Sequence, residues 1–295
     1  MSKKSGKILV AVVVAIVLIC GAFSSKVPFL QDVFNDTEVT DSNGVHFIDV
    51  GQGDSILVKT EDADILIDAG PGINAGDLTS YLKEQEIETI DYFITTHPHE
   101  DHIGGADDVI YSFNVKNIII PYIPESVIPT TKVFENMLDA IEERNVNVIQ
   151  AESGAKYTFG ENSFEILGPN DEYEDLNMLS VITRFTVGGK TFMFTGDTEK
   201  ESEYDTLKKY SDLSADVLKV AHHGSSTSSS EKFVKAVSPD FAVISCGYDN
   251  SYGHPHDETT DLLEKLNIEY FRTDNDGNIV FSIENGELVV NKEVA

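Results

Sequence analysis

Three short clusters of metal-binding side chains, each placed directly after an apolar strand-like run, most constrain how this chain can fold. The densest is Thr96-His-Pro-His-Glu-Asp-His-Ile-Gly-Gly105, which holds three His and one Asp within six residues. The others are Thr195-Gly-Asp197 and Lys219-Val-Ala-His-His-Gly-Ser225. Imidazole and carboxylate groups are the ligands that Zn, Mn and Fe ions take in proteins. Because the clusters are scattered over both halves of the chain, we expect one domain in which they converge.

The first cluster predicts ligands for two ions. His97 and His99 stand two residues apart, so an extended turn presents both side chains to one ion. Asp101 and His102 follow at the start of an expected helix and point towards a second ion.

The later clusters complete the ligand set. Asp197 can bridge two ions through its two carboxylate oxygens. Adjacent residues of a strand point in opposite directions, so we expect one of His222 and His223, with preference for His223, to ligate the second ion and the other to contact substrate. Asp54 and Asp68 each follow a strand-like run, where a carboxylate orients a ligating His or caps a turn.

Short apolar runs alternate with amphipathic stretches along the rest of the chain. We expect strands at 45–50, 55–59, 64–68, 90–95, 117–121, 146–150, 156–159, 163–167, 181–187, 191–195, 216–220, 240–245, 269–272, 278–283 and 288–290, and helices at 77–86, 104–111, 130–144, 199–210, 231–237 and 259–266. Two successive units of strands followed by helices predict two sheets packed face to face with helices outside. Two separate domains are the alternative.

The N-terminus carries the pattern of an export signal. Lys3, Lys4 and Lys7 precede an apolar run at 8–23, which as a helix spans roughly 24 Å and falls short of a membrane core. We therefore interpret 1–25 as a signal peptide or signal-anchor, 26–44 as a polar linker and 45–292 as the folded domain. The protein is then secreted, or anchored on the outer face of the cell membrane through this segment if it stays uncleaved.

Charge and cysteine content exclude some classes of protein. The 21 Lys and Arg against 51 Asp and Glu give a formal net charge of −30, which excludes a broad basic surface that holds nucleic acid stably. A nuclease remains possible, because a bound metal supplies positive charge locally. Of the two Cys, only Cys246 lies in the folded part, so neither a disulfide framework nor a zinc site built on Cys is expected there.

Several motifs in fixed order resemble one family. The chain is similar to metallo-β-lactamase fold hydrolases, and more narrowly to the C-terminal hydrolase domain of ComEC-type DNA-uptake (competence) proteins and its stand-alone relatives. The segments that carry the resemblance are Asp49-Val-Gly-Gln-Gly-Asp-Ser55, Ile67-Asp-Ala-Gly70, Thr96–Gly105, Asn177-x-x-Ser180, Thr195-Gly-Asp197, Leu218–Ser225 and Tyr252-Gly-His-Pro-His256.

The resemblance implies an α/β fold, an αββα four-layer sandwich, with the site at one sheet edge. It implies two divalent metal ions, the first held by His97, His99 and Asp197 and the second by Asp101, His102, Asp197 and one of His222 and His223. Many relatives have a further His between the first cluster and the Gly-Asp motif. This chain has no His from 103 to 221 and shows Asn177 and Ser180 there. That leaves the first ion with few nitrogen ligands, which makes Mn a candidate beside Zn.

The resemblance also implies a metal-dependent hydrolase, and a phosphodiesterase or nuclease is our leading hypothesis. Two ions activate a water, Asp101 accepts its proton, and His254 reaches the substrate or protonates the leaving group. Asn177, Ser180 and Ser225 are expected to contact the substrate, and Lys219 offers a further contact to phosphate. DNA, a phosphocholine ester and a wall-polymer phosphodiester are all open as substrates. The alternatives are an amide or thioester hydrolase, and a membrane-tethered binding module with an impaired site.

Overall fold

The computed structural model describes residues 44–293. The expected signal segment at 1–25 and all but the last residue of the expected linker lie outside the described residues, so that division of the chain stays a prediction. None of the helices in the described range has the length and apolar character that a membrane crossing requires.

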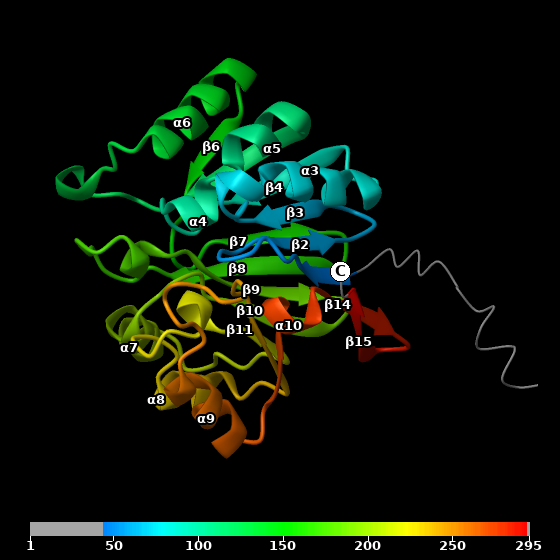
Figure 1. Cartoon of the computed structure of the whole chain (residues 1–295), viewed down its shortest axis with the longest axis vertical. Helices are drawn as coiled ribbons and strands as arrows, with labels where there is room; N and C mark the ends of the chain where they lie inside the picture. Colours follow the sequence, from blue (N-terminus) through cyan, green and yellow to red (C-terminus); the bar gives the residue numbers. More distant parts are fainter. Residues whose placement is uncertain (1–43, 294–295) are drawn as a thin grey trace, which may run out of the picture. The chain divides into compact units, whose positions relative to one another are not determined.

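Within residues 44–293 the strands form two mixed sheets (Figure 1). The eight-stranded sheet has the order β15-β14-β1-β2-β3-β4-β5-β6 and the seven-stranded sheet β13-β12-β11-β10-β9-β8-β7. The first sheet contains β1 (Gly44–Phe47), β2 (Ile56–Lys59), β3 (Asp64–Ile67), β4 (Thr89–Ile94), β5 (Asn114–Ile120), β6 (Asn147–Gln150), β14 (Asn278–Glu284) and β15 (Glu287–Glu293). The second contains β7 (Lys156–Phe159), β8 (Asn162–Gly168), β9 (Ile182–Val187), β10 (Lys190–Phe194), β11 (Val217–Lys219), β12 (Phe241–Ile244) and β13 (Glu269–Arg272).

Helices cover the outer faces of both sheets, as Figure 1 shows. The first sheet carries α3 (Ala75–Glu84), α4 (Glu100–Ile103), α5 (Ala106–Ser112) and α6 (Lys132–Arg144); the second carries α7 (Lys200–Lys209), α8 (Glu231–Val237) and α9 (Asp257–Lys265). The remaining pieces are α10 (Thr273–Asp276) and the 3-10 turns η1 (Gly72–Asn74), η2 (Glu125–Val127), η3 (Asn177–Leu179) and η4 (Ala221–Gly224). The expected αββα sandwich is therefore confirmed.

Strands with two apolar faces explain the layers. In β10, Phe192 and Phe194 join the core between the sheets, while Met193 faces the helices of the second sheet. In β3, Ile65 faces the other sheet and Leu66 faces the helices of the first. Successive side chains of a strand alternate in direction, so a continuous apolar run buries both faces.

The parallel strands decide where polar residues gather. β3, β4 and β5 run parallel in the first sheet, and β10, β11 and β12 run parallel in the second. The carboxyl ends of parallel neighbours meet at one edge of a sheet, where irregular loops can carry a site.

Candidate metal centre

The carboxyl ends of four strands bring the predicted clusters together. Asp68 follows β3, the first cluster follows β4, Asp197 follows β10, and η4 follows β11. The two sheets touch closely here, because the backbone nitrogen of Val181 donates to the Thr96 oxygen at 3.0 Å. Gly196 adopts a φ of +51°, and a Cβ there would lie 2.9 Å from the Thr96 Cβ. A residue with a side chain at 196 would separate the two halves of the site.

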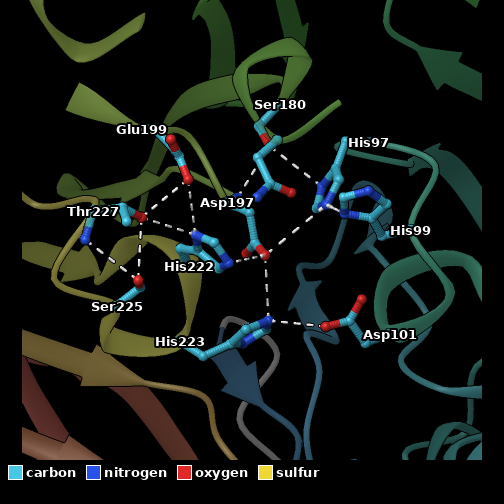
Figure 2. A network of polar contacts seen from close by, with 12 residues as sticks. His97, His99, Asp101, Ser180, Asp197, Glu199, His222, His223, Ser225 and Thr227 are labelled. Atoms are coloured by element: carbon cyan, nitrogen blue, oxygen red, sulfur yellow. Dashed lines mark hydrogen bonds and ion pairs between the residues drawn. The ribbon is translucent and has the colours of Figure 1, made fainter. Parts of the chain in front are cut away.

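Four of the predicted ligands form a tight group. One donor atom each from Asp101, His102, Asp197 and His223 lies within 4.8 Å of every other. His102 Nε2 is 3.3 Å from Asp197 Oδ1, and His223 Nε2 is 3.4 Å from Asp197 Oδ2. His223 Nε2 also lies 3.2 Å from Asp101 Oδ2. A dashed line marks this contact in Figure 2.

The chemistry of these donors fits a divalent cation. His102 Nε2, His223 Nε2 and Asp197 Oδ1 are buried and have no hydrogen-bond partner. Buried polar atoms are nearly always paired in native proteins, so a convergent unpaired set indicates a ligand. Two imidazoles and two carboxylates are a donor set suited to Zn or Mn. The group can therefore hold a divalent metal ion.

Neighbouring oxygens fix the orientation of the two imidazoles. His102 Nδ1 donates to Asp68 Oδ2 at 2.8 Å, and His223 Nδ1 donates to the Ser245 backbone oxygen at 2.9 Å. Asp68 also accepts from the nitrogen and the hydroxyl of Thr96, each at 2.7 Å. With Nδ1 engaged, each ring presents Nε2 to the metal. Asp68 thus lies where the sequence analysis placed it, behind a ligating His.

A buried ion pair lies directly behind the ligands. The Lys219 ammonium contacts the Asp54 carboxylate and donates to the Gly196 oxygen at 3.2 Å. Both side chains are buried, and Asp54 Oδ1 lies 3.4 Å from His223 Nδ1. Lys219 therefore does not reach a substrate phosphate as we expected. Its charge is enclosed with Asp54, which the sequence pattern did not reveal.

The ligands hold one another in charged form. Burial raises the pKa of Asp101 and of Asp197, but His223 and His102 outweigh it and hold both pKa values below their usual range. Burial lowers the pKa of His102 and of His223, but nearby carboxylates, Asp197 foremost, raise both pKa values well above their ordinary value. A metal ion that binds here displaces imidazole protons, so metal affinity falls as pH falls.

His97 and His99 lie together on another side of Asp197 (Figure 2). His97 Nε2 is 3.0 Å from His99 Nδ1 and 3.9 Å from Asp197 Oδ2. Ser180 is fully buried; its hydroxyl is 3.3 Å from His97 Nδ1 and accepts from the Asp197 nitrogen at 3.0 Å. Ser180 thus lies beneath the ligands instead of contacting substrate as we expected.

His222 and His223 do not alternate as strand residues. Both lie in η4 with left-handed backbone, at φ of +52° and +53°. Their Nε2 atoms lie 3.7 Å and 3.4 Å from the same oxygen, Asp197 Oδ2. We expected only one of His222 and His223 to face the metal, because a strand would point their side chains in opposite directions. Glu199 and Thr227, which the sequence analysis missed, lie 3.6 Å and 3.3 Å from His222 Nδ1.

A cleft of about 740 Å³ opens onto the ligands and contains two of the remaining predicted residues. Asn177 and His254 line it, whereas Ser225 is buried and bonds Thr227 instead. The His254 ring centre is 5.6 Å from that of His222, and His254 Nδ1 has no partner. Burial and the neighbouring His223 lower the pKa of His254 to about 4, so its imidazole is uncharged at pH 7.

Comparisons with known sequences identify relatives. A sequence model described as the metallo-beta-lactamase superfamily matches residues 48–248. ComE operon protein 3 of Bacillus subtilis is 30% identical over 287 residues, which cover 91% of this chain and 36% of that protein. Competence protein ComA of Neisseria gonorrhoeae is 30% identical over 81% of this chain and 32% of its own length. The chain thus spans about a third of the length of these relatives, which are competence proteins of the ComEC type.

Solved structures show the same fold at low identity. CmlA of Streptomyces venezuelae, a diiron beta-hydroxylase, superposes with a TM-score of 0.58 at 12% identity over 82% of this chain and 54% of that one. The metallo-beta-lactamase fold protein YhfI of Bacillus subtilis gives a TM-score of 0.51 at 14% identity over 78% of this chain and 95% of that one. These similarities concern the fold alone.

Proposed function

The chain belongs to the metallo-beta-lactamase superfamily, and from this premise we propose that it is an extracytoplasmic phosphodiesterase of the nuclease type that uses two divalent ions. The observation that carries the proposal is the convergent donor group of Asp101, His102, Asp197 and His223. Three of its buried donor atoms have no hydrogen-bond partner, and an open cleft is lined by all of its members except His102. The superfamily and this group identify a metal-dependent hydrolase. The bond it breaks and the number of ions are the proposal.

The residues of the site would have three roles, which are to bind metal, to accept a proton and to contact the substrate. The group of four would hold one ion, and His97 and His99 would hold the second with Asp197 shared between them. Divalent ions in such a site polarise phosphoryl oxygens and lower the pKa of a water. Asp101 lines the cleft with its side chain 28% exposed and would accept a proton from a water in the cleft. His254, unpaired at Nδ1, lines the same cleft and would contact the substrate there.

The names of the relatives support phosphodiester chemistry, and the types of ligand in the site bear on which ion it holds. The relatives include competence proteins and one called Recombination protein 2, of Haemophilus influenzae, at 27% identity. Buried Ser180 lies beside His97, and no nitrogen ligand comes from residues 103–221. An ion held by His97, His99 and the Asp197 carboxylate has two imidazole ligands, a set that suits Mn as well as Zn. The Lys-flanked apolar run at 8–23 supports secretion or anchoring on the outer face of the membrane.

Metal add-back on the purified protein tests the proposal. Stripped of metal, the protein is incubated with bis(p-nitrophenyl) phosphate and either Zn or Mn, and bound metal is counted by elemental analysis. We expect hydrolysis that needs metal and two ions per chain; Asp101→Ala should abolish turnover, while the exposed Asp139→Ala should not. A folded, metal-loaded protein that leaves this ester intact but opens an amide or thioester would replace the proposal. Metal content without turnover on any ester would favour a binding module.

A further inference from the structure

The cleft over the ligands has an apolar wall. The apolar residues that line it are Pro71, Ile73, Pro98, Pro129, Leu176 and Tyr252. Ile73 is 90% exposed and Tyr252 is 65% exposed, although both face the site. Large apolar side chains exposed around a functional cleft are typical of surfaces that bind a ligand.

Ile73 is presented by an anchored turn. It lies at the centre of η1, where Asn74 Nδ2 donates to the Val50 oxygen at 2.6 Å. The Gly72 nitrogen donates to Glu100 Oε1 at 3.0 Å, which ties the turn to the helix that carries Asp101. The turn thus fixes the backbone of Ile73 at the cleft, so little backbone order has to be gained when a substrate packs against its side chain.

The same cleft offers nothing to a polyanion. Among the described residues that line it, none is Lys or Arg, and the acidic ones are Glu100, Asp101 and Asp197. His223 also lines it, but its imidazole must lose its proton when it binds a metal ion. The nearest buried cation, Lys219, is already paired with Asp54. Bound divalent ions offset these carboxylates and one substrate anion, but each further phosphate meets no counter-charge on a chain of net charge −30.

We propose that the cleft takes a phosphodiester with a single negative charge whose uncharged, apolar ester group packs against Ile73 and Tyr252. This inference rests on the proposed phosphodiesterase function and names its substrate class. A free nucleic-acid strand is a poor substrate unless another component delivers it, because successive phosphates are repelled. Ile73 is then a residue that determines specificity.

Two substrates at varied ionic strength test the inference on the metal-loaded full-length protein. Bis(p-nitrophenyl) phosphate carries one charge and two aromatic groups, and an oligothymidylate of about 20 nucleotides carries many charges. We expect kcat/KM to favour the small ester, and kcat/KM on the oligonucleotide to rise about threefold or more between roughly 0.02 and 0.5 M salt as repulsion is screened. A nuclease that attracts its substrate loses activity over the same range.

Variants at Ile73 locate the effect. Ile73→Ser should lower kcat/KM on the small ester about fivefold, mainly by raising KM. A loss of about 40 Å² of apolar contact with the ester group would have this effect. Ile73→Lys should raise kcat/KM on the oligonucleotide at low salt. Val148, which is 48% exposed on β6 away from the cleft, gives matched controls as Val148→Ser and Val148→Lys, which should change neither rate.

The outcomes separate the two proposals. The inference would be overturned if the protein hydrolysed both substrates, preferred the oligonucleotide and lost activity on it as salt rose. It would also be overturned if Ile73→Ser hydrolysed the small ester as fast as the wild type. Either result would leave the phosphodiesterase proposal intact. Hydrolysis of neither substrate with Zn or Mn would remove the phosphodiesterase and the inference together.

Discussion

Replacing Lys219 by Met leaves every proposed ligand in place, but it should lower the free energy of unfolding more than any other single change next to the site. The Lys219 side chain is fully buried and the Asp54 side chain is 2% exposed, so the pair has no water to replace a lost partner. Burial raises the pKa of Asp54, but Lys219 and the imidazoles of His223 and His102 outweigh it and hold that pKa below its ordinary value. Without Lys219, an ionised carboxylate is left in the interior, a change that costs about 3–5 kcal/mol. His223 remains 3.4 Å away and should keep the loss near the lower end.

Urea unfolding in the presence of a chelator measures this cost without a contribution from metal binding. We expect Lys219→Met to lower the free energy of unfolding by about 3 kcal/mol, and the double variant with Asp54→Asn to recover at least about 2 kcal/mol of it, because neither buried charge then remains. Lys235→Met is the control: Lys235 lies 2.6 Å from Glu231 with both side chains largely exposed, and should cost at most about 0.5 kcal/mol. A loss below about 1 kcal/mol for Lys219→Met, or strict additivity in the double variant, would refute the reasoning.

Two further predictions concern the close approach of the backbone at Gly104 and the protonation of the buried His46. In Gly104→Ala the added Cβ would clash with the Gly72 backbone nitrogen, so α4 must shift, at a cost of about 1–3 kcal/mol in the free energy of unfolding measured with urea. In Gly76→Ala the added Cβ meets nothing within 4 Å, and Ala inside a helix should raise the free energy of unfolding by about 0.5–1 kcal/mol. Equal effects of the two would contradict the close approach. Burial, with a smaller effect of Lys59, lowers the pKa of His46 to about 4 from 6.5. The unfolded chain therefore binds this proton first, and stability should fall by about 3 kcal/mol as pH drops from 7 to 4, a loss that His46→Gln should not show. Parallel pH profiles would exclude this role.

Local patterns were enough to predict most elements. The expected strands at 156–159 and 269–272 and the helix at 231–237 coincide with β7, β13 and α8, because period-two and helical spacing of apolar residues is a property of short segments. Gly188 and Gly189 join the expected strands at 181–187 and 191–195, which are β9 and β10 and pair in antiparallel register. The short α10 after β13 was not predicted, since nothing apolar marks it.

The candidate site was predicted in its residues but not in its geometry. Clustering of His and Asp after strands indicated the donors. The left-handed turn at His222 and His223 is tied to a distant segment, because the His222 nitrogen donates to the Gly196 oxygen at 3.0 Å. Treating the pair as strand residues therefore predicted the wrong alternation. Pairing of Lys219 with Asp54 and the burial of Ser180 likewise join residues far apart in the chain. No local pattern reports such contacts.

The pairing of β1 with β14 sets the order in which the protein can mature. Phe281 of β14 packs against Phe47, Phe192 and Phe271 at the centre of the core between the sheets. Every proposed ligand precedes this strand, so a nascent chain that has reached residue 270 carries all its donors while β1 still has an unpaired edge. We therefore expect the donors to reach their aligned positions only after β14 has paired with β1. A prematurely terminated product holds the same imidazoles and carboxylates but lacks the frame that aligns them.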